Sequence, residues 1–183
     1  RECHGDLHLG NVAWLADTPD TAPRAIPFDG IEFAANLRWI DVISEVAFIV
    51  MDLHARGFAN QANRFLNRWL EQNGDLGFGG LALLDFYLVY RAMVRAKIAR
   101  IRASQSDTCA TERQTALSDY AALTALARRF AEPRRCALIL MHGVSGSGKS
   151  VLAATLCENI DAIRIRSDVE RKRLHGLTPM ARS

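Results

Sequence analysis

The sequence of 183 residues is poor in cysteine and proline, with four and five of each, and it has no long apolar run. The cysteines lie too far apart to indicate a disulfide framework. The longest apolar runs, residues 46–51 and 136–141, are much shorter than the roughly 18 residues that a membrane helix needs, and no basic-plus-apolar leader is present. We therefore expect a cytoplasmic protein in a reducing setting, with no membrane as a partner.

The composition is that of a folded protein, with 49% apolar and 23% charged residues, but the net charge of +3 is unevenly distributed. Residues 1–133 contain 14 Lys/Arg against 16 Asp/Glu, and the remainder contains 9 against 4. Pro133 ends a helical pattern at the same point. Two domains are therefore predicted, residues 1–132 and 133–183. The basic tail has no aromatic residue for base stacking, so nucleic-acid binding is not favoured.

Hydrophobic periodicity predicts a mainly helical first domain with a small β-hairpin. The hairpin consists of strands at 12–15 and 25–28 joined by a turn at 16–21, and the helices cover 41–56, 58–72, 80–103 and 111–131. The second domain alternates, with a buried strand at 136–141, a helix at 148–159, a strand at 162–166 and a further helix capped by Asp168. The fold class is therefore α/β overall.

The most specific motif is Gly143-Val144-Ser145-Gly146-Ser147-Gly148-Lys149-Ser150, which matches the pattern G-x-x-x-x-G-K-[ST]. It follows a predicted strand and opens a predicted helix, as a phosphate-binding loop must. Its glycines let backbone N–H groups converge on phosphates, while the lysine reaches the β- and γ-phosphates and the last serine binds Mg²⁺. The predicted nucleotide-binding residues are Gly143, Ser145, Gly146, Ser147, Gly148, Lys149 and Ser150, with Ser150 also a metal ligand. The alternative is a flexible glycine turn.

Nineteen residues after Lys149, Asp168 and Arg171 follow the second predicted strand of the tail. Strand, phosphate loop, helix, strand and Asp-x-x-Arg together resemble the P-loop kinases of small molecules and polynucleotide ends, such as gluconate kinase. The resemblance implies that Asp168 is a general base and that Arg171 contacts phosphate or substrate. Alternatively, Asp168 only caps a helix and Arg171 is a solvated charge.

The beginning of the chain, His4-Gly5-Asp6-Leu7-His8-Leu9-Gly10-Asn11, places a carboxylate and a carboxamide five residues apart. Phosphoryl transfer needs such a pair, because a carboxylate orients the attacking hydroxyl and an amide oxygen holds Mg²⁺. Asp29 follows Asn11 by eighteen residues, at the end of a predicted strand, where its carboxylate can bridge the metal to nucleotide phosphates.

These residues resemble the aminoglycoside phosphotransferases, which share the protein-kinase fold. The resemblance covers residues 1 to about 132 and implies the C-terminal, catalytic lobe of that fold. It implies Asp6 as catalytic base, with Asn11 and Asp29 as magnesium ligands. Asp41 and Glu45 match the acidic helix that supports the catalytic loop in that family.

The long helix expected over 80–103 carries an apolar face flanked by arginines. The face is predicted to pack in the core, with a solvated edge. The alternative is a groove for an anionic substrate or partner. The residues of the face are Tyr87, Tyr90, Val94, Ile98 and Ile101, and the flanking residues are Arg91, Arg95 and Arg102.

Together the two resemblances match bacterial proteins in which an aminoglycoside phosphotransferase-like domain precedes a P-loop ATP-binding domain. The predicted function is transfer of the γ-phosphate of ATP, with Mg²⁺, to a hydroxyl of a small molecule. The alternative is a nucleotide-sensing regulatory protein whose kinase-like lobe does not transfer. Because the chain opens on Arg1 and ends at Ser183, we expect it to be a piece of a longer protein, inactive alone, without the nucleotide-binding lobe of the first domain and with a truncated second domain.

Overall fold

The computed structural model describes residues 1–16, 22–134 and 136–177, and these form two compact units. The first unit contains residues 1–58 and 81–133, and the second contains residues 59–80 and 134–183 as far as they are described. The predicted division of the chain into domains 1–132 and 133–183 stays a prediction.

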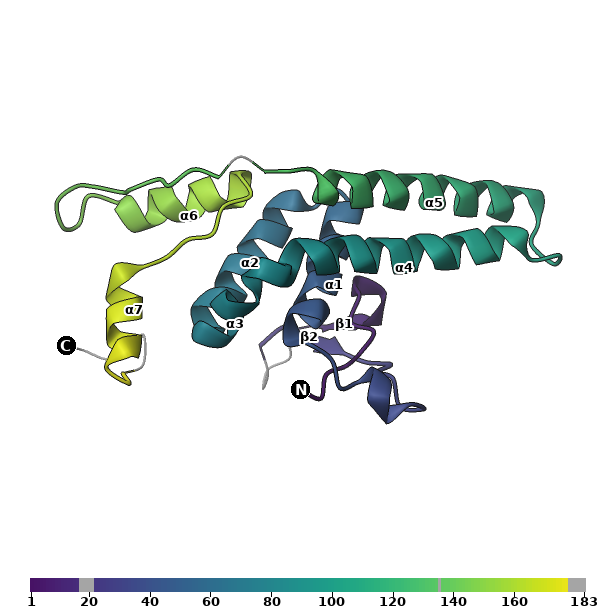
Figure 1. Cartoon of the computed structure of the whole chain (residues 1–183), viewed down its shortest axis with the longest axis horizontal. Helices are drawn as coiled ribbons and strands as arrows, with labels where there is room; N and C mark the ends of the chain where they lie inside the picture. Colours follow the sequence, from purple (N-terminus) through teal and green to yellow (C-terminus); the bar gives the residue numbers. More distant parts are fainter. Residues whose placement is uncertain (17–21, 135, 178–183) are drawn as a thin grey trace. The chain divides into compact units, whose positions relative to one another are not determined.

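The core of the first unit is α1 (Val42–Ala55), a helix that is buried along most of its length. Asp41 starts the helix, since its side chain accepts a hydrogen bond from the Ile43 backbone N–H at 3.0 Å. Packed on α1 are α4 (Leu84–Ser104) and α5 (Ala110–Ala131), which lie side by side as an antiparallel pair (Figure 1). The largest fully buried side chains of α1 are Phe48, Ile43 and Met51.

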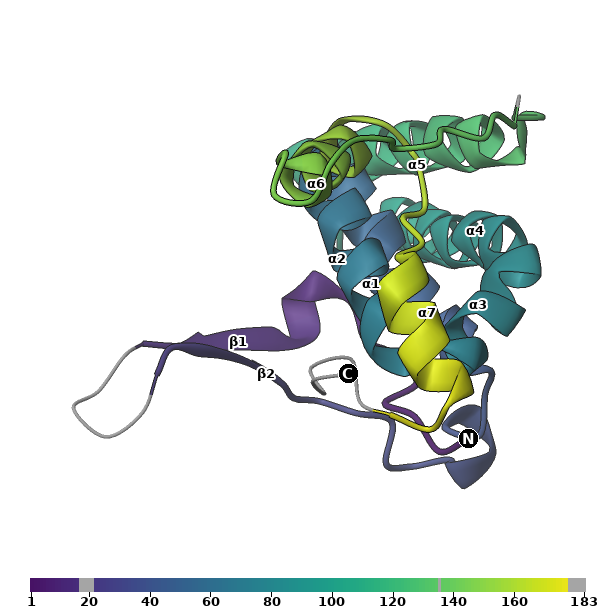
Figure 2. The ribbon, with the colours of Figure 1, turned by 90° about the vertical axis from the view of Figure 1, so that its left-hand side faces the viewer.

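A two-stranded antiparallel sheet confirms the predicted hairpin. Its strands are β1 (Val12–Leu15) and β2 (Arg24–Pro27), which pair from Val12 opposite Pro27 to Leu15 opposite Arg24 (Figure 2). The predicted turn at 16–21 lies outside the described residues except for its first position. Short 3₁₀ turns flank the sheet, namely η1 (Leu9–Asn11) before it and η2 (Ala35–Leu37) after it, and η3 (Leu81–Leu83) precedes α4.

The second unit contains four helices in its described part: α2 (Ala59–Asn73), α3 (Asp75–Gly80), α6 (Lys149–Asn159) and α7 (Ser167–Leu174). Helix α2 packs against α6. Asparagine side chains of α2 also bind the backbone of the segment that follows α6. Asn63 Nδ2 donates to the Ile160 carbonyl at 3.2 Å, and Asn67 Nδ2 donates to the Ala162 carbonyl at 2.9 Å. The Arg164 backbone N–H donates in turn to Asn67 Oδ1 at 2.7 Å.

The prediction of two strands in the tail is wrong for this structure. Residues 136–141 and 162–166 belong to no strand, and the side chains of 136–141 are exposed, with Leu138 at 84%. A parallel strand needs a hydrogen-bonded neighbour beside it and covered faces. The polar groups of residues 162–164 are satisfied by the Asn67 side chain instead of a neighbouring strand.

The prediction of which face of α4 is buried is also wrong in part. The buried side of the helix carries Leu88, Ala92 and Ala96 together with Arg91, whereas Ile98 is 55% exposed. Small alanine side chains let α4 approach its neighbours closely, and this packing selects the face independently of the bulkier residues. By length and composition alone, the helical stretch Gly77–Ser104 could cross a membrane, but a core helix of a soluble protein passes the same test.

Candidate functional site

The loop from His4 to Asn11 brings its two predicted catalytic side chains together. Asn11 Nδ2 donates to the Asp6 backbone carbonyl at 3.0 Å and to Asp6 Oδ2 at 3.3 Å. Asn11 is buried, while the Asp6 side chain is 46% exposed. The structure therefore presents the Asp6 carboxylate to solvent, and Asn11 fixes its orientation from inside. Because the amide nitrogen faces Asp6, the oxygen is the end available for a cation.

Glycine is required at position 5 of this loop because the backbone is left-handed there, with φ of +87°. A Cβ atom at Gly5 would also lie 3.0 Å from both the Ile31 side chain and the Leu37 carbonyl oxygen. The His-Gly-Asp order thus has a local reason, since only glycine lets the chain turn at this point and bring Asp6 out of the core.

Glu45 of α1 supports the loop from below, as predicted for the acidic start of this helix. Its Oε1 accepts hydrogen bonds from the His4 backbone N–H at 2.9 Å and from the Gly5 backbone N–H at 3.2 Å. Burial raises the pKa of Glu45, and the hydrogen bond from Gly5 and the charge of Arg91 oppose that rise. Asp41, the other predicted support, instead caps α1.

A second acid of α1, Asp52, also holds the loop and was not predicted. Its Oδ2 accepts a hydrogen bond from the Leu9 backbone N–H at 3.0 Å and one from Arg56 Nε at 3.2 Å. Asp52 is only 4% exposed. It lies seven residues after Glu45, on the same helical face, so two acids two turns apart on an otherwise apolar helix were the available signal.

Arg91 of α4 also supports the loop. The sequence predicted Arg91 only as a residue that flanks the apolar face of this helix. Its Nη1 donates to the Gly5 carbonyl and its Nε to the Ser44 carbonyl, both at 3.2 Å. The guanidinium also lies 4.6 Å from the centre of the Phe48 ring. Arg91 is 8% exposed, and burial lowers its pKa. A buried cation thus joins α1, α4 and the loop before Asp6.

Arg91→Met is expected to lower the free energy of unfolding by about 2–4 kcal/mol, because two buried carbonyls lose a charged donor. Arg100→Met, at an exposed position of the same helix, should change it by less than about 0.5 kcal/mol. Urea unfolding followed by circular dichroism measures both. Equal stability of the two variants would mean that Arg91 does not hold the loop.

Asp29 is the third predicted site residue, and the hydrogen bonds of its neighbour Phe28 keep it next to the loop. The Phe28 backbone N–H donates to the Asn11 carbonyl at 2.9 Å, and His4 Nε2 donates to the Phe28 carbonyl at 2.8 Å. Asp29 is exposed and has φ of +59°, and no other non-glycine residue in the described ranges has a positive φ. Such a backbone conformation costs energy and is concentrated at functional sites.

The donor set fits a magnesium ion only in part. Asn11 and Asp29 supply the oxygen atoms that Mg²⁺ prefers. Within the described ranges, however, His, Cys, Asp and Glu side chains nowhere gather in groups of three or more that could hold a metal. Magnesium commonly keeps several waters and binds through one or two protein oxygens together with nucleotide phosphates. The loop therefore suits a metal that arrives with a nucleotide.

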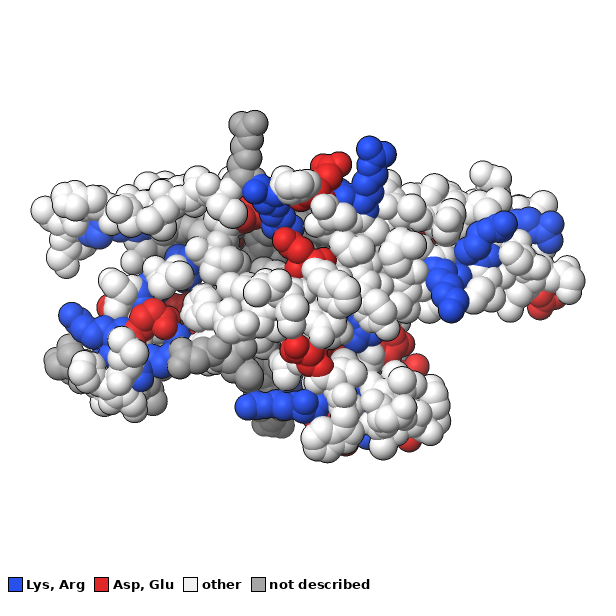
Figure 3. Space-filling view, in the orientation of Figure 1, with Lys and Arg blue, Asp and Glu red and all other residues white. Residues whose placement is uncertain are grey.

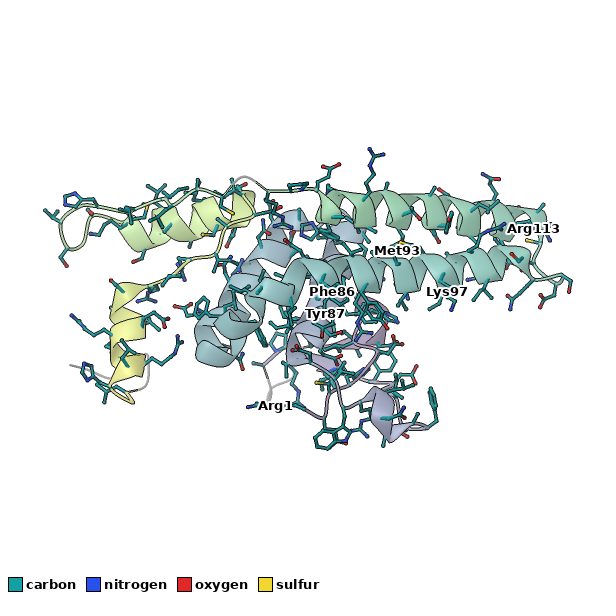
Figure 4. The ribbon with its side chains drawn as sticks, in the orientation of Figure 1. Arg1, Phe86, Tyr87, Met93, Lys97 and Arg113 are labelled. Atoms are coloured by element: carbon teal, nitrogen blue, oxygen red, sulfur yellow. The ribbon has the colours of Figure 1, made fainter. Side chains whose placement is uncertain are left out.

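A cavity of about 390 Å³ lies beside Gly5, and aromatic side chains of α4 form part of its wall. Phe86 and Tyr87 lie at the start of α4 with ring centres 5.2 Å apart (Figure 4), and Tyr90 stacks on Phe86. Burial and the Asp41 carboxylate raise the pKa of Tyr87. The wall of the cavity therefore combines aromatic and aliphatic side chains with the Asp41 carboxylate and the Arg91 guanidinium.

In the second unit, the phosphate-loop motif adopts a left-handed turn just before α6. Gly143, Gly146 and Gly148 all have positive φ, at 148°, 79° and 80°. Gly148 is the N-cap of α6, so the helix dipole and its free N–H groups point into the loop. The alternative, a flexible glycine turn, and the predicted phosphate loop need the same glycines, but only the phosphate loop needs a helix to begin at Lys149.

Lys149 folds back over its own loop. Its Nζ donates to the Gly143 carbonyl at 2.7 Å and to the Val144 carbonyl at 2.5 Å, and Ser147 Oγ lies 3.4 Å away. The ammonium group is thus held across the mouth of the turn, where it can meet a phosphate. Ser145 and Ser150 are exposed on the same segment, and the Ser150 carbonyl accepts a hydrogen bond from Arg164.

Asp168 lies in the first turn of α7, not at its cap as expected, since the N-cap residue is Arg166. Arg166 Nη2 donates to Asp168 Oδ2 at 2.9 Å, and Arg166 also binds Glu71 of α2 at 3.0 Å. Partial burial raises the pKa of Asp168, but the hydrogen bonds and charge of Arg166 lower it more, so the net shift is downward. To act as a base, Asp168 must first break its hydrogen bonds to the Arg166 guanidinium. Arg171 is exposed on α7.

Comparison with known proteins identifies the class of the tail. Residues 138–183 match the family model described as AAA domain, which covers the phosphate loop and everything after it. This match supports a P-loop, kinase-like module in the tail. No solved structure matches the chain.

Relatives extend over nearly the whole chain. The uncharacterized protein Rv2004c of Mycobacterium tuberculosis and the uncharacterized protein Mb2027c of Mycobacterium bovis are each 34% identical over 171 residues, which is 93% of this chain. The chain spans 32% of the length of these relatives. Because the similarity covers 93% of the chain, it includes sequence on both sides of residue 133.

Proposed function

We propose that this chain belongs to a cytoplasmic, ATP-dependent phosphotransferase that transfers the γ-phosphate to a hydroxyl of a small molecule. Residues 1–132 form its aminoglycoside phosphotransferase-like catalytic lobe, and residues 133–183 begin a second, P-loop ATP-binding module. The observation that carries the proposal is the pair Asp6 and Asn11, held together at 3.3 Å on a loop that three buried charges support.

In the proposed reaction Asp6 accepts the proton of the acceptor hydroxyl as its oxygen attacks the γ-phosphorus. The new O–P bond forms as the bond to the ADP oxygen breaks, and ADP leaves with the electron pair. Asn11 and Asp29 would hold Mg²⁺, which when bound neutralises charge on the phosphates. Glu45, Asp52 and Arg91 position the loop and do not touch the reacting atoms.

In the tail, we propose that Gly143, Ser145, Gly146, Ser147 and Gly148 form the phosphate cradle, with Lys149 on the β- and γ-phosphates. Ser150 would bind the metal. Asp168 and Arg171 remain proposals for an acceptor base and a phosphate contact. Asp168 accepts a hydrogen bond from Arg166, so in this proposal Arg166 rotates away before Asp168 takes a proton.

A nucleotide-sensing regulatory protein is the second candidate, with a lobe that binds and does not transfer. The exposed Asp6 carboxylate favours the enzyme, since a sensor has no need of an oriented base beside a metal-binding amide. Incubation of the intact protein with labelled ATP and a panel of small alcohols distinguishes them. A labelled product that requires Asp6 supports the enzyme, and nucleotide binding without any product supports the sensor.

Asn11→Ala and Asp29→Ala should each raise the Mg²⁺ concentration needed for half-maximal transfer by about tenfold, because each removes one oxygen ligand of the proposed metal. Glu32→Ala is the matched control, an exposed acid three residues after Asp29. Magnesium titrations of the initial rate measure all three. Unchanged titrations for both site variants would contradict the metal assignment, and an effect of Glu32→Ala alone would move the ligand to that residue.

A further inference from the structure

A groove of about 890 Å³ lies in the same unit as Asp6, between the end of α1, the second half of α4 and one face of α5. This volume is within the usual range of small-molecule sites, roughly 300–1,000 Å³. Its apolar surface comes from side chains such as Ile98, Leu123 and Leu126. The groove can thus enclose a molecule of drug size.

Arginines from all three helices line this groove. Arg56 is paired with Asp52, and Arg129 lies against His54 at 3.3 Å. Arg95 and Arg102 differ, because within the described ranges no carboxylate forms an ion pair with either. They are seven residues apart on one face of α4, which separates them by about 10 Å along the helix. Unpaired guanidinium groups at the wall of a groove bind planar anions such as phosphate and carboxylate.

The carboxylates of the groove offset its positive charge only in part, since the lining has four arginines and three acids. Asp52 already accepts hydrogen bonds from Leu9 and Arg56, and Glu112 accepts one from the Cys109 backbone N–H at the start of α5. Asp119 is the third acid of the lining. Figure 3 shows basic side chains on the end of the α4 and α5 pair, where Figure 4 labels Lys97 and Arg113, and neither residue lines the groove. The groove therefore favours an anion over a cation.

The groove is connected to the catalytic loop. Asp52 lines the groove and also accepts the Leu9 N–H. In the loop itself, His8 Nε2 is 3.6 Å from Asp6 Oδ2. Burial lowers the pKa of His8, and the charge of Arg95 acts in the same direction. Asp52 is thus the residue that links the groove to the loop of the proposed base.

We propose that the acceptor carries an anionic group, phosphate or carboxylate, which Arg95 and Arg102 bind while its hydroxyl reaches Asp6. The second half of this statement rests on the proposed function, whereas anion binding in the groove does not. A polycationic acceptor is disfavoured, because these two guanidinium groups, which have no paired carboxylate in the described ranges, would repel it.

Calorimetric titration with glycerol 3-phosphate, glycerate and glycerol tests the groove. The intact protein carries Lys149→Ala, so that the phosphate loop contributes little. We expect saturable binding of the two anions and none of glycerol, with affinity about tenfold weaker in Arg95→Ala and in Arg102→Ala. Arg100→Ala, on the same helix and outside the groove, should stay within about twofold. Circular dichroism confirms that each variant is folded.

Absence of saturable anion binding, or an equal loss in Arg100→Ala, overturns the assignment of the groove. Transfer from labelled ATP to the same three molecules then separates the two proposals. Equal transfer to glycerol and to the anions supports the proposed function and overturns the anionic acceptor. Arginine-dependent binding of the anions without any transfer supports the groove and overturns the proposed function.

Discussion

Asp6→Asn should lower the turnover of phosphoryl transfer by at least about 100-fold, the usual contribution of a positioned base. The asparagine keeps the size of the side chain, and its backbone carbonyl still accepts the hydrogen bond from Asn11 at 3.0 Å. The loop should therefore keep its shape while the site loses its proton acceptor. Nucleotide affinity should change by less than a few fold, because the base does not contact the nucleotide in the proposed reaction.

Steady-state rates and ATP titrations of the intact protein measure this effect. Asp107→Asn provides the matched control, because it makes the same change at an exposed position between α4 and α5. Its turnover should equal that of the parent. Near-full turnover in Asp6→Asn would exclude Asp6 as the base, and equal losses in both variants would show that the effect is unspecific.

Lys149→Ala should abolish Mg-ATP binding at the P-loop module. The ammonium group is held over the loop by the carbonyls of Gly143 and Val144, and it is the charge nearest to the cradle in the motif. Its removal leaves backbone N–H groups and the dipole of α6, which can bind phosphate weakly but do not neutralise a triphosphate. We expect the affinity for ATP at this module to fall by at least about 100-fold.

Calorimetry of the intact protein and of its Lys149→Ala form decides this prediction through the stoichiometry of bound ATP. Lys97→Ala removes an exposed lysine of α4, labelled in Figure 4, and should leave the stoichiometry unchanged. The same stoichiometry in Lys149→Ala and the parent would mean that the loop is not a nucleotide site. If Lys149→Ala also loses transfer through Asp6, the two modules are coupled.

Residues close together in the sequence were the best guide to the site. Asp6 and Asn11 are five positions apart, so a short loop that turns at Gly5 brings them into hydrogen-bond contact. The phosphate loop is equally local, since its glycines, its lysine and the first turn of α6 are consecutive. Helix boundaries followed the same logic, because caps such as Asp41 act on N–H groups two residues away.

Pairings between distant residues were decided by the tertiary structure alone. Arg91 reaches the Gly5 carbonyl across 86 residues, and its polar side chain gave no reason to expect burial. Asn67 binds the backbone at Ala162 and Arg164, and residues 162–166 form no strand, although their alternating isoleucines favour one.

The sequence by itself therefore determined the two local motifs, the hairpin and the order of helices, because each depends on contacts within a few residues. Only the tertiary structure decided which face of α4 is buried, which acids support the loop, and that Arg166 binds Glu71 of α2. The physical reason is that burial and ion pairing depend on which elements meet in space. Apolar periodicity along one helix does not specify which other element will pack against it.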